Sequence, residues 1–357
     1  MSGNICESFI MKSDSNHSIQ FQVLAPEQHN RWDEFVEICP QGTLFHTTWW
    51  YRAWRIEPTV HVIYGDDEQI QAGICLNIGR KIGVKSTVRP PLTPCNGPLF
   101  LPSRKHSRHH KNTHAKNMLL MTIRSLPMMG MYDLILRPED RDVLPYLWNG
   151  FESHVCYTHV IPCKEQGNWL QQASKTQQWS IRKANRDVAE GKYTLDESPP
   201  ISAVASLLAA TANFKGFSSA HYSSLLSVWW KDVTDRGVGK AYLLRDDEGN
   251  TISTALMVWD SRCAYYVSGG IRPDFRKRSL ANVLVIHRMI ENAHAMNLDF
   301  DFEGSILPGV ERFFRSFGAE MRPLYRVVKL PSWRAFVTWQ AYHYFSKHRK
   351  RQWLSSE

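Results

Sequence analysis

The hydrophobic and polar positions of residues 265–318 predict strand, turn, helix, strand and helix in succession. Tyr265–Gly270 is an aromatic and β-branched run that ends on two glycines, as a strand followed by a turn does. A helix is predicted over Leu280–Met296, and the apolar–acidic alternation of Leu298–Glu303 is typical of a half-buried strand. A last helix closes with Phe313–Gly318, because glycine is a common C-terminal stop.

The turn Arg276–Asn282 carries three cations and small residues directly before the predicted helix. Backbone N–H groups without intrahelical partners and the helix dipole both favour an anion at such a position. We therefore expect the backbone of residues 278–282 to hold an anion such as a phosphate, with Arg276 and Arg278 as charge partners. The alternative is an ordinary solvated basic turn before a helix.

The pattern predicts further strands and helices in both halves of the chain. In the first half, strands are expected over Phe21–Ala25, Val60–Gly65, Gln69–Ile78, Met131–Leu136 and Val155–Pro162, and helices over Pro26–Cys39, His46–Trp54 and 111–125. In the second half, helices Asn168–Gly191, Ile201–Asn213 and His221–Arg236 precede strands Ala241–Arg245, Thr251–Trp259 and Cys263–Gly269. This mixture predicts an α/β chain with mixed sheets flanked by helices.

Length and composition narrow the class of protein. A chain of 357 residues suggests about two domains, and 43% hydrophobic with 22% charged residues is ordinary for a soluble protein. No apolar run approaches the ~18 residues of a membrane helix. The seven scattered cysteines fit a reducing compartment, so a cytoplasmic location is expected. A formal charge of +9 favours anionic partners such as coenzyme phosphates, tRNA or the inner face of a membrane.

Histidines and cations gather between residues 104 and 116. His110 and His114 would share a helix face, as two metal ligands can, and His106 and His109 lie close in sequence. Arginines and lysines surround them, and no carboxylate or cysteine is close. Packed cations oppose a divalent ion, so we expect a basic surface loop and no metal.

The turn and its neighbours resemble the GNAT acyltransferase superfamily. The pyrophosphate loop of that family has Gln or Arg, two variable residues, Gly, one more residue, and then Gly or Ala. Arg276, Ser279 and Ala281 take these places, with Ser279 in place of the first glycine. Because a serine side chain limits how closely the backbone can approach a phosphate, this is a departure from the pattern.

The longer chain is similar to the double-domain FemAB-like branch, which includes the BioF2-like acetyltransferases, over roughly residues 20–330. The supporting segments are Leu44–Trp50, Pro91–Pro94 with Gly97–Pro98, Ser180–Ala184, Phe302–Ser305, and Phe313–Gly318 before a final strand at Met321–Leu330. The resemblance implies tandem GNAT-like domains.

The expected division of the chain follows from this resemblance. Residues 1–18 are expected to be a disordered leader, and residues 19–164 an acceptor-side domain without a phosphate loop. Residues 165–332 would form the donor-binding domain. Residues 333–357 are a basic aromatic tail, either a packed helix with a solvated end or an amphipathic helix on anionic lipid.

The resemblance also assigns roles to individual residues. The donor site would comprise Val267, Arg276, Arg278, Ser279, Leu280, Ala281 and Asn282. Glu303 is either a general base for the amine or a structural carboxylate that pairs with Arg272. Ser305 and Tyr325 are candidates for proton donation to the leaving group.

Acceptor binding is assigned to both halves of the chain. Trp49, Tyr51, Thr93 and Asn96 are expected to form a wall of the acceptor site, although such aromatic residues are more often core. Arg182 and Lys183 lie on a basic helix that would border a groove for an anionic acceptor or a tRNA acceptor stem. The alternative for that helix is a solvated face.

These features predict an N-acyltransferase that uses acyl-CoA, such as acetyl-CoA, to acylate an amine. The acceptor would be a small molecule or a cell-envelope precursor, namely an amino sugar or a peptide. One alternative is an aminoacyl-tRNA-dependent peptidyltransferase of peptidoglycan synthesis, and another is a degenerate, non-catalytic binding module. We prefer acyl-CoA because the Arg276–Ala281 loop is retained. The protein would be cytoplasmic, with a peripheral contact to anionic membrane as an option, and DNA is not an expected partner.

Overall fold

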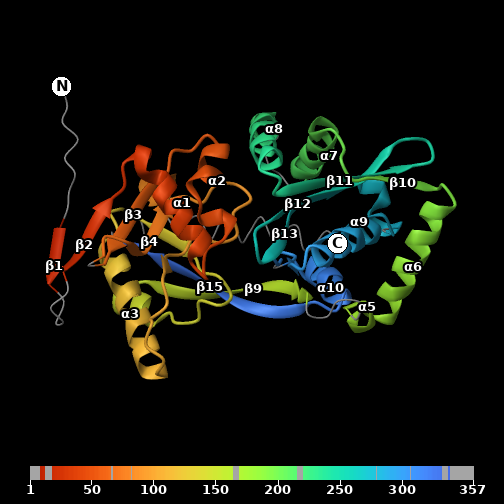
Figure 1. Cartoon of the computed structure of the whole chain (residues 1–357). Helices are drawn as coiled ribbons and strands as arrows, with labels where there is room; N and C mark the ends of the chain where they lie inside the picture. Colours follow the sequence, from red (N-terminus) through yellow and green to blue (C-terminus); the bar gives the residue numbers. More distant parts are fainter. Residues whose placement is uncertain are drawn as a thin grey trace. The chain divides into compact units, whose positions relative to one another are not determined.

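The computed structural model describes residues 9–12, 18–65, 67–81, 83–163, 169–214, 220–278, 280–305, 307–331 and 337. The chain divides into two compact units, which we describe separately (Figure 1). The first comprises Met1–Arg52, Ile56–Cys156 and Leu324–Glu357, and the second comprises Ala53–Arg55 and Tyr157–Pro323. This division falls within the strand Glu152–Ile161 and again within the strand Glu320–Lys329, while the domain bounds expected from the sequence stay a prediction.

The first unit contains an antiparallel sheet in the order β1-β2-β3-β4-β7. Its strands are β1 (Phe9–Lys12), β2 (Ser18–Val23), β3 (Thr59–Tyr64), β4 (Ile70–Leu76) and β7 (Leu99–Phe100). Strands β3 and β4, which lie within the strands predicted over Val60–Gly65 and Gln69–Ile78, pair antiparallel. Strand β1 lies within residues 1–18, so part of the segment expected to be a disordered leader is in fact paired with β2.

Two further strand pairs complete the first unit. Strands β5 (Ile78–Lys81) and β6 (Val84–Thr87) form a hairpin. Strand β8 (Tyr132–Ile135) pairs antiparallel with the Arg326–Lys329 part of β15 (Glu320–Lys329).

The helices of the first unit bury apolar side chains at helical spacing. They are η1 (Pro26–Gln28), α1 (His29–Ile38), η2 (Leu44–His46), α2 (Thr48–Ala53), α3 (Arg108–Arg124) and α4 (Leu144–Trp148). Helix α1, within the helix predicted over Pro26–Cys39, buries Trp32, Phe35 and Val36 on one face. Leu119 and Ile123 of α3 belong to a core cluster with residues of β4 and β8.

The second unit is built on a mixed sheet in the order β10-β11-β12-β13-β14-β9. Its strands are β9 (Glu152–Ile161), β10 (Tyr193–Asp196), β11 (Gly239–Asp246), β12 (Thr251–Trp259), β13 (Cys263–Ile271) and β14 (Asp299–Asp301). Strands β13 and β14 are parallel, and the other neighbouring pairs are antiparallel. A parallel pair needs a crossover, which α9 supplies.

Helices cover both faces of this sheet. They are α5 (Trp169–Gln172), α6 (Lys175–Ala189), α7 (Ile201–Phe214), α8 (Ala220–Asp235), α9 (Leu280–Ala295) and α10 (Pro308–Ser316). Figure 1 shows α7 and α8 on one side of β11 and β12, and α9 on the other. The core beneath α9 contains Phe300, Phe302, Phe314 and Phe317, which contribute large apolar areas.

The prediction of an α/β chain with mixed sheets flanked by helices is confirmed. None of the helices in the described ranges is long and apolar enough to cross a membrane. Of the predicted tail at residues 333–357, the structure describes Val337 alone, so both interpretations of the tail concern residues outside the description.

Candidate functional site

The end of the parallel ladder between β13 and β14 gives the second unit an open strand edge. The ladder pairs Cys263 with Asp299 and ends where Tyr265 meets Asp301. Strand β13 continues to Ile271 and stays paired with β12 along its other edge. Among the residues that the structure describes, no strand pairs with the β14 side of β13 after Tyr265. An edge of this kind presents backbone N–H and C=O groups that an extended ligand can bind.

A β-bulge lies at the same place in β13. Leu256 of β12 pairs with Ser268, whereas the next residue, Met257, pairs with Tyr266, so Val267 is the extra residue. Bulges redirect a strand and often lie beside functional sites. The Val267 side chain is buried, so its contribution to an open edge comes from its backbone.

The turn after β13 leads directly to the start of α9. A short 3₁₀ helix over Pro273–Arg278 connects them, and α9 begins at Leu280 without an acidic residue in its first turn. Arg272 donates from Nε to Asp274 at 3.0 Å, and its guanidinium lies 4.4 Å from the centre of the Phe275 ring. A helix start without acidic side chains keeps its partial positive charge available to an anion.

A second turn follows the short strand β14. Glu303 has a φ of 58° and Gly304 a φ of 65°, so two consecutive residues adopt the left-handed conformation. The Glu303 backbone N–H donates to Asp301 Oδ1 at 2.7 Å, and the Thr158 hydroxyl donates to the same oxygen. These bonds fix the turn against strand β9.

The open edge of β13 and the turns after β13 and β14 lie within a region that matches a known protein family. Residues 177–315 match the model of the acetyltransferase (GNAT) domain family Acetyltransf_6. The second unit carries a GNAT acetyltransferase domain. The resemblance to the GNAT superfamily that was stated from the sequence is therefore confirmed for these residues.

Solved structures extend the similarity to most of the chain. The crystal structure of FemX is 14% identical, with a TM-score of 0.59, over 85% of this chain and 96% of that one. The C-terminal domain of a putative lysylphosphatidylglycerol synthetase from Agrobacterium fabrum is 10% identical, with a TM-score of 0.51, over 88% and 95%. L-PGS from Bacillus licheniformis is 13% identical, with a TM-score of 0.50, over 88% and 95%. At these identities the likeness establishes the fold alone, which is similar to that of FemX over most of the chain. No curated protein matches the sequence.

The structure describes the predicted donor loop of the GNAT domain only in part. Ser279 and the side chains of Arg276 and Arg278 lie outside the described residues. Leu280 packs against the core and Ala281 is buried. Asn282 Oδ1 accepts a hydrogen bond from the Ser253 hydroxyl at 2.6 Å. The described side chains therefore support the start of α9, and a ligand there would meet backbone N–H groups.

The structure changes the expected setting of the three catalytic candidates. Strand β14 ends at Asp301 and Glu303 lies in the left-handed turn, so the expectation that both carboxylates share one face of a strand was wrong. Arg272, the partner named in the structural alternative for Glu303, donates to Asp274. Ser305 Oγ accepts from the Leu307 N–H at 3.2 Å. Tyr325 lies on β15 in the first unit and packs against its core.

A histidine next to this turn was not predicted. His159 of β9 is 1% exposed, and its backbone oxygen accepts from the Phe302 N–H at 2.9 Å. Its Nε2 lies 3.7 Å from Glu311 Oε1 of α10. Burial lowers the pKa of His159, while the Glu311 carboxylate opposes that shift. A neutral imidazole beside the turn can accept a proton. Nothing in the spacing of a lone histidine within a predicted strand pointed to it.

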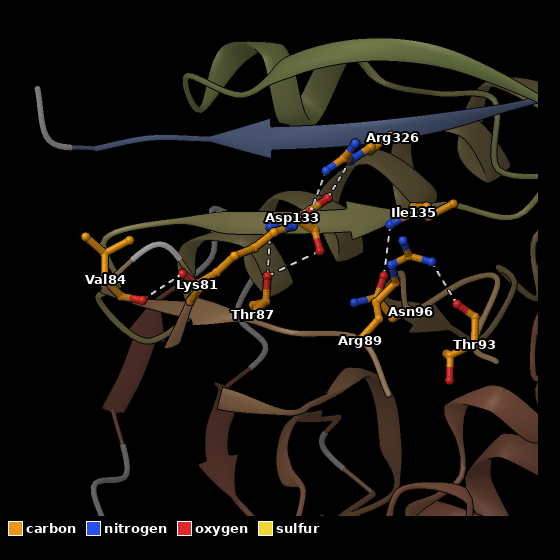
Figure 2. A network of polar contacts seen from close by, with 10 residues as sticks. Lys81, Val84, Thr87, Arg89, Thr93, Asn96, Asp133, Ile135 and Arg326 are labelled. Carbon is orange, nitrogen blue, oxygen red and sulfur yellow. Dashed lines mark hydrogen bonds and ion pairs between the residues drawn. The ribbon is translucent and has the colours of Figure 1, made fainter. Parts of the chain in front are cut away.

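The predicted acceptor residues of the first unit are largely parts of its core. Tyr51 is 1% exposed, its hydroxyl donates to the Cys75 carbonyl at 2.9 Å, and burial raises its pKa. Thr93 accepts from Trp50 Nε1 at 2.8 Å, and Asn96 accepts from the Ile135 N–H at 2.9 Å (Figure 2). These three side chains are buried and form hydrogen bonds with other residues of the chain. Trp49 is half-buried.

The basic helix of the GNAT domain retains an exposed face. Lys183 pairs with Asp187 at 2.9 Å, but Arg182 is exposed. Trp179 of the same helix, α6, is 55% exposed. Arg182 therefore remains available to a ligand, and Lys183 is held by its own helix.

Proposed function

We propose that this protein transfers an acyl group from acyl-CoA, such as acetyl-CoA, to an amine of a small molecule or cell-envelope precursor. One observation carries the proposal: β13 separates from β14 after Tyr265 and then leads through a cationic turn into α9. An extended thioester donor suits the open edge of β13. Its phosphates suit the N-terminus of α9, with Arg276 and Arg278 as charge partners.

The proposed reaction needs a positioned amine and a proton acceptor. The amine nitrogen attacks the thioester carbonyl carbon, the C–S bond breaks, and the thiolate of CoA leaves. Glu303, or a water that it orients, takes the proton of the amine, and Ser305 supplies one to the thiolate. Positioning of the two substrates would supply much of the acceleration.

Titration calorimetry with acetyl-CoA tests the donor assignment. We expect the parent protein to bind with a Kd of about micromolar order and Arg276→Ala to lose most of that affinity, because a charge-assisted phosphate contact is removed. Arg262→Ala is the matched control, since Arg262 lies in the exposed turn before β13. An absence of binding by the parent protein, or equal binding by Arg276→Ala, would contradict the assignment.

A second donor, aminoacyl-tRNA, is favoured by the exposed face of α6. Lys175, Trp179, Arg182 and Arg186 are all exposed, and their spacing places them on one side of the helix. Within the described residues, no carboxylate pairs with these three cations. Cations that flank an exposed aromatic ring suit a phosphate backbone and unstacked bases.

Binding of tRNA should distinguish the two donors. If aminoacyl-tRNA is the donor, Arg182→Glu with Arg186→Glu should weaken tRNA binding about tenfold or more, with a smaller salt dependence, because phosphate contacts are lost. Arg236→Glu with Arg245→Glu changes the charge equally at other places in the second unit. Fluorescence anisotropy over a salt series measures the effect. Salt-sensitive RNA binding without binding of acetyl-CoA or any acyl transfer would instead favour a non-catalytic module.

The site of action that we propose is the cytoplasm, including the inner face of the membrane. The cysteines in the described ranges are free thiols, which fits a reducing compartment. Acyl-CoA and aminoacyl-tRNA are both found there, so either donor agrees with this location.

A further inference from the structure

Helix α4 exposes three large apolar side chains on one face. Leu144 is 45%, Leu147 44% and Trp148 60% exposed, and their spacing of three and one residues places them side by side. Pro145 and Tyr146 face the core instead. Single exposed apolar residues are common, whereas three on one helical turn form a patch that usually has a partner.

The neighbouring part of the chain is strongly basic. Residues 69–132 contain no aspartate or glutamate. Four exposed cations, Arg104, Lys105, Arg108 and Lys111, lie before and within the first turn of α3. In the part of the chain that the structure describes, no carboxylate pairs with any of them. Cations at a helix N-terminus oppose the helix dipole, so this arrangement does not serve helix stability.

The basic and apolar groups lie on packed helices. Helix α3, which Figure 1 shows within the first unit, contacts α4. Lys116 of α3 lies 5.3 Å from the centre of the Trp148 ring and pairs with Asp142, directly before α4. Asp140 is engaged by Arg137 at 2.9 Å. Asp140 and Asp142, which precede α4, are therefore already paired, and the exposed cations at the start of α3 add positive charge to this surface.

We infer that the face formed by α3 and α4 docks on a bilayer that contains anionic phospholipid. Trp148, Leu144 and Leu147 would enter the boundary between headgroups and acyl chains, and the cations of α3 would lie among the phosphates. The same cations would also attract RNA, but the two exposed leucines would contribute little to RNA binding. The aliphatic side chains therefore favour a membrane over a nucleic acid. This inference is independent of the acyl donor.

Vesicle co-sedimentation tests the inference on the full chain. The probes are vesicles of phosphatidylcholine alone and of phosphatidylcholine with added phosphatidylglycerol. We expect binding to the anionic vesicles to be about tenfold tighter, because several cations approach their surface. Leu147→Ser with Trp148→Ser, and separately Arg108→Glu with Lys111→Glu, should each weaken that binding about tenfold.

Two controls match these variants. Ile38→Ser removes an apolar side chain of α1 that is 70% exposed, and Arg80→Glu with Lys85→Glu changes the same number of charges on the exposed β5–β6 hairpin. Both should bind anionic vesicles like the parent protein, and thermal melts should show that all variants are folded. Equal or absent binding to the two vesicle types by the parent protein would overturn the inference. So would unchanged binding by the Leu147 and Trp148 variant, or binding of tRNA in place of vesicles.

Discussion

Gly304→Ala should lower the free energy of unfolding by about 3 kcal/mol, because it combines a strained backbone with a steric clash. Gly304 has a φ of 65°, which residues with a side chain rarely adopt. A Cβ added there would lie 2.0 Å from the carbonyl oxygen of Tyr157, and backbone cannot move aside cheaply. Because this turn also fixes Glu303, acyl transfer should fall together with stability. Chemical denaturation and an activity assay measure the two effects.

Gly309→Ala is the matched control for Gly304→Ala. Gly309 lies in the first turn of α10, and a Cβ added there would have no neighbour within 4 Å. Alanine at such a position should leave stability unchanged or raise it by up to about 1 kcal/mol, because it restricts the unfolded chain. If both variants unfold like the parent protein, the turn does not pack against Tyr157 as described.

The turn at Glu303 and Gly304 is a feature that the sequence pattern did not predict. The pattern of Leu298–Glu303 located the short strand β14 and the acidic residue that follows it. It continued the strand through Glu303, whereas Glu303 lies in a left-handed turn whose Asp301 accepts a hydrogen bond from Thr158 of β9, which is distant in sequence. Alternation reports local periodicity, and it does not report a bond that a remote strand supplies.

Strong periodicity located the longer elements, and short ones were missed. Helix α9 and the strands β11, β12 and β13 were predicted close to their bounds, because each has enough residues for a clear pattern. Strand β10 has four residues and exists through pairing with β11, so its sequence alone carried little signal. Such tertiary pairing is a common reason for missed edge strands.

Aromatic composition alone does not distinguish an acceptor site from a core. The segment near Trp49 and Tyr51 has the composition of either a ligand wall or a core. The buried hydroxyl of Tyr51, bonded to the Cys75 carbonyl, shows that the residue packs inside the first unit. The donor loop is a different case, since Arg276, Arg278 and Ser279 remain predictions that binding experiments must test.

Asp133→Asn should lower the free energy of unfolding by about 3–5 kcal/mol, because it breaks a buried ion pair and leaves its partners uncompensated. Both Asp133 oxygens accept from Arg326 at 2.7 Å, and Oδ2 also accepts from Lys81 at 2.7 Å (Figure 2). The carboxylate thereby ties β8 to β15 and to the β5–β6 hairpin. The Asp133 N–H also donates a hydrogen bond to the Thr87 hydroxyl at 2.7 Å. Urea denaturation measures the loss.

The loss caused by Asp133→Asn should depend on pH. Burial alone would raise the pKa of Asp133, but Arg326 and Lys81 outweigh it and lower the pKa to about 2. Since the unfolded value is about 3.9, the charge contributes about 2 kcal/mol above that pH, and this contribution disappears as the pH falls towards 2. The difference between parent and variant should therefore shrink on acidification. Asp235→Asn, which breaks the exposed pair with Lys231, should change stability little at any pH. An equal loss for Asp133→Asn at neutral and acidic pH would show that packing, and not charge, makes this residue important.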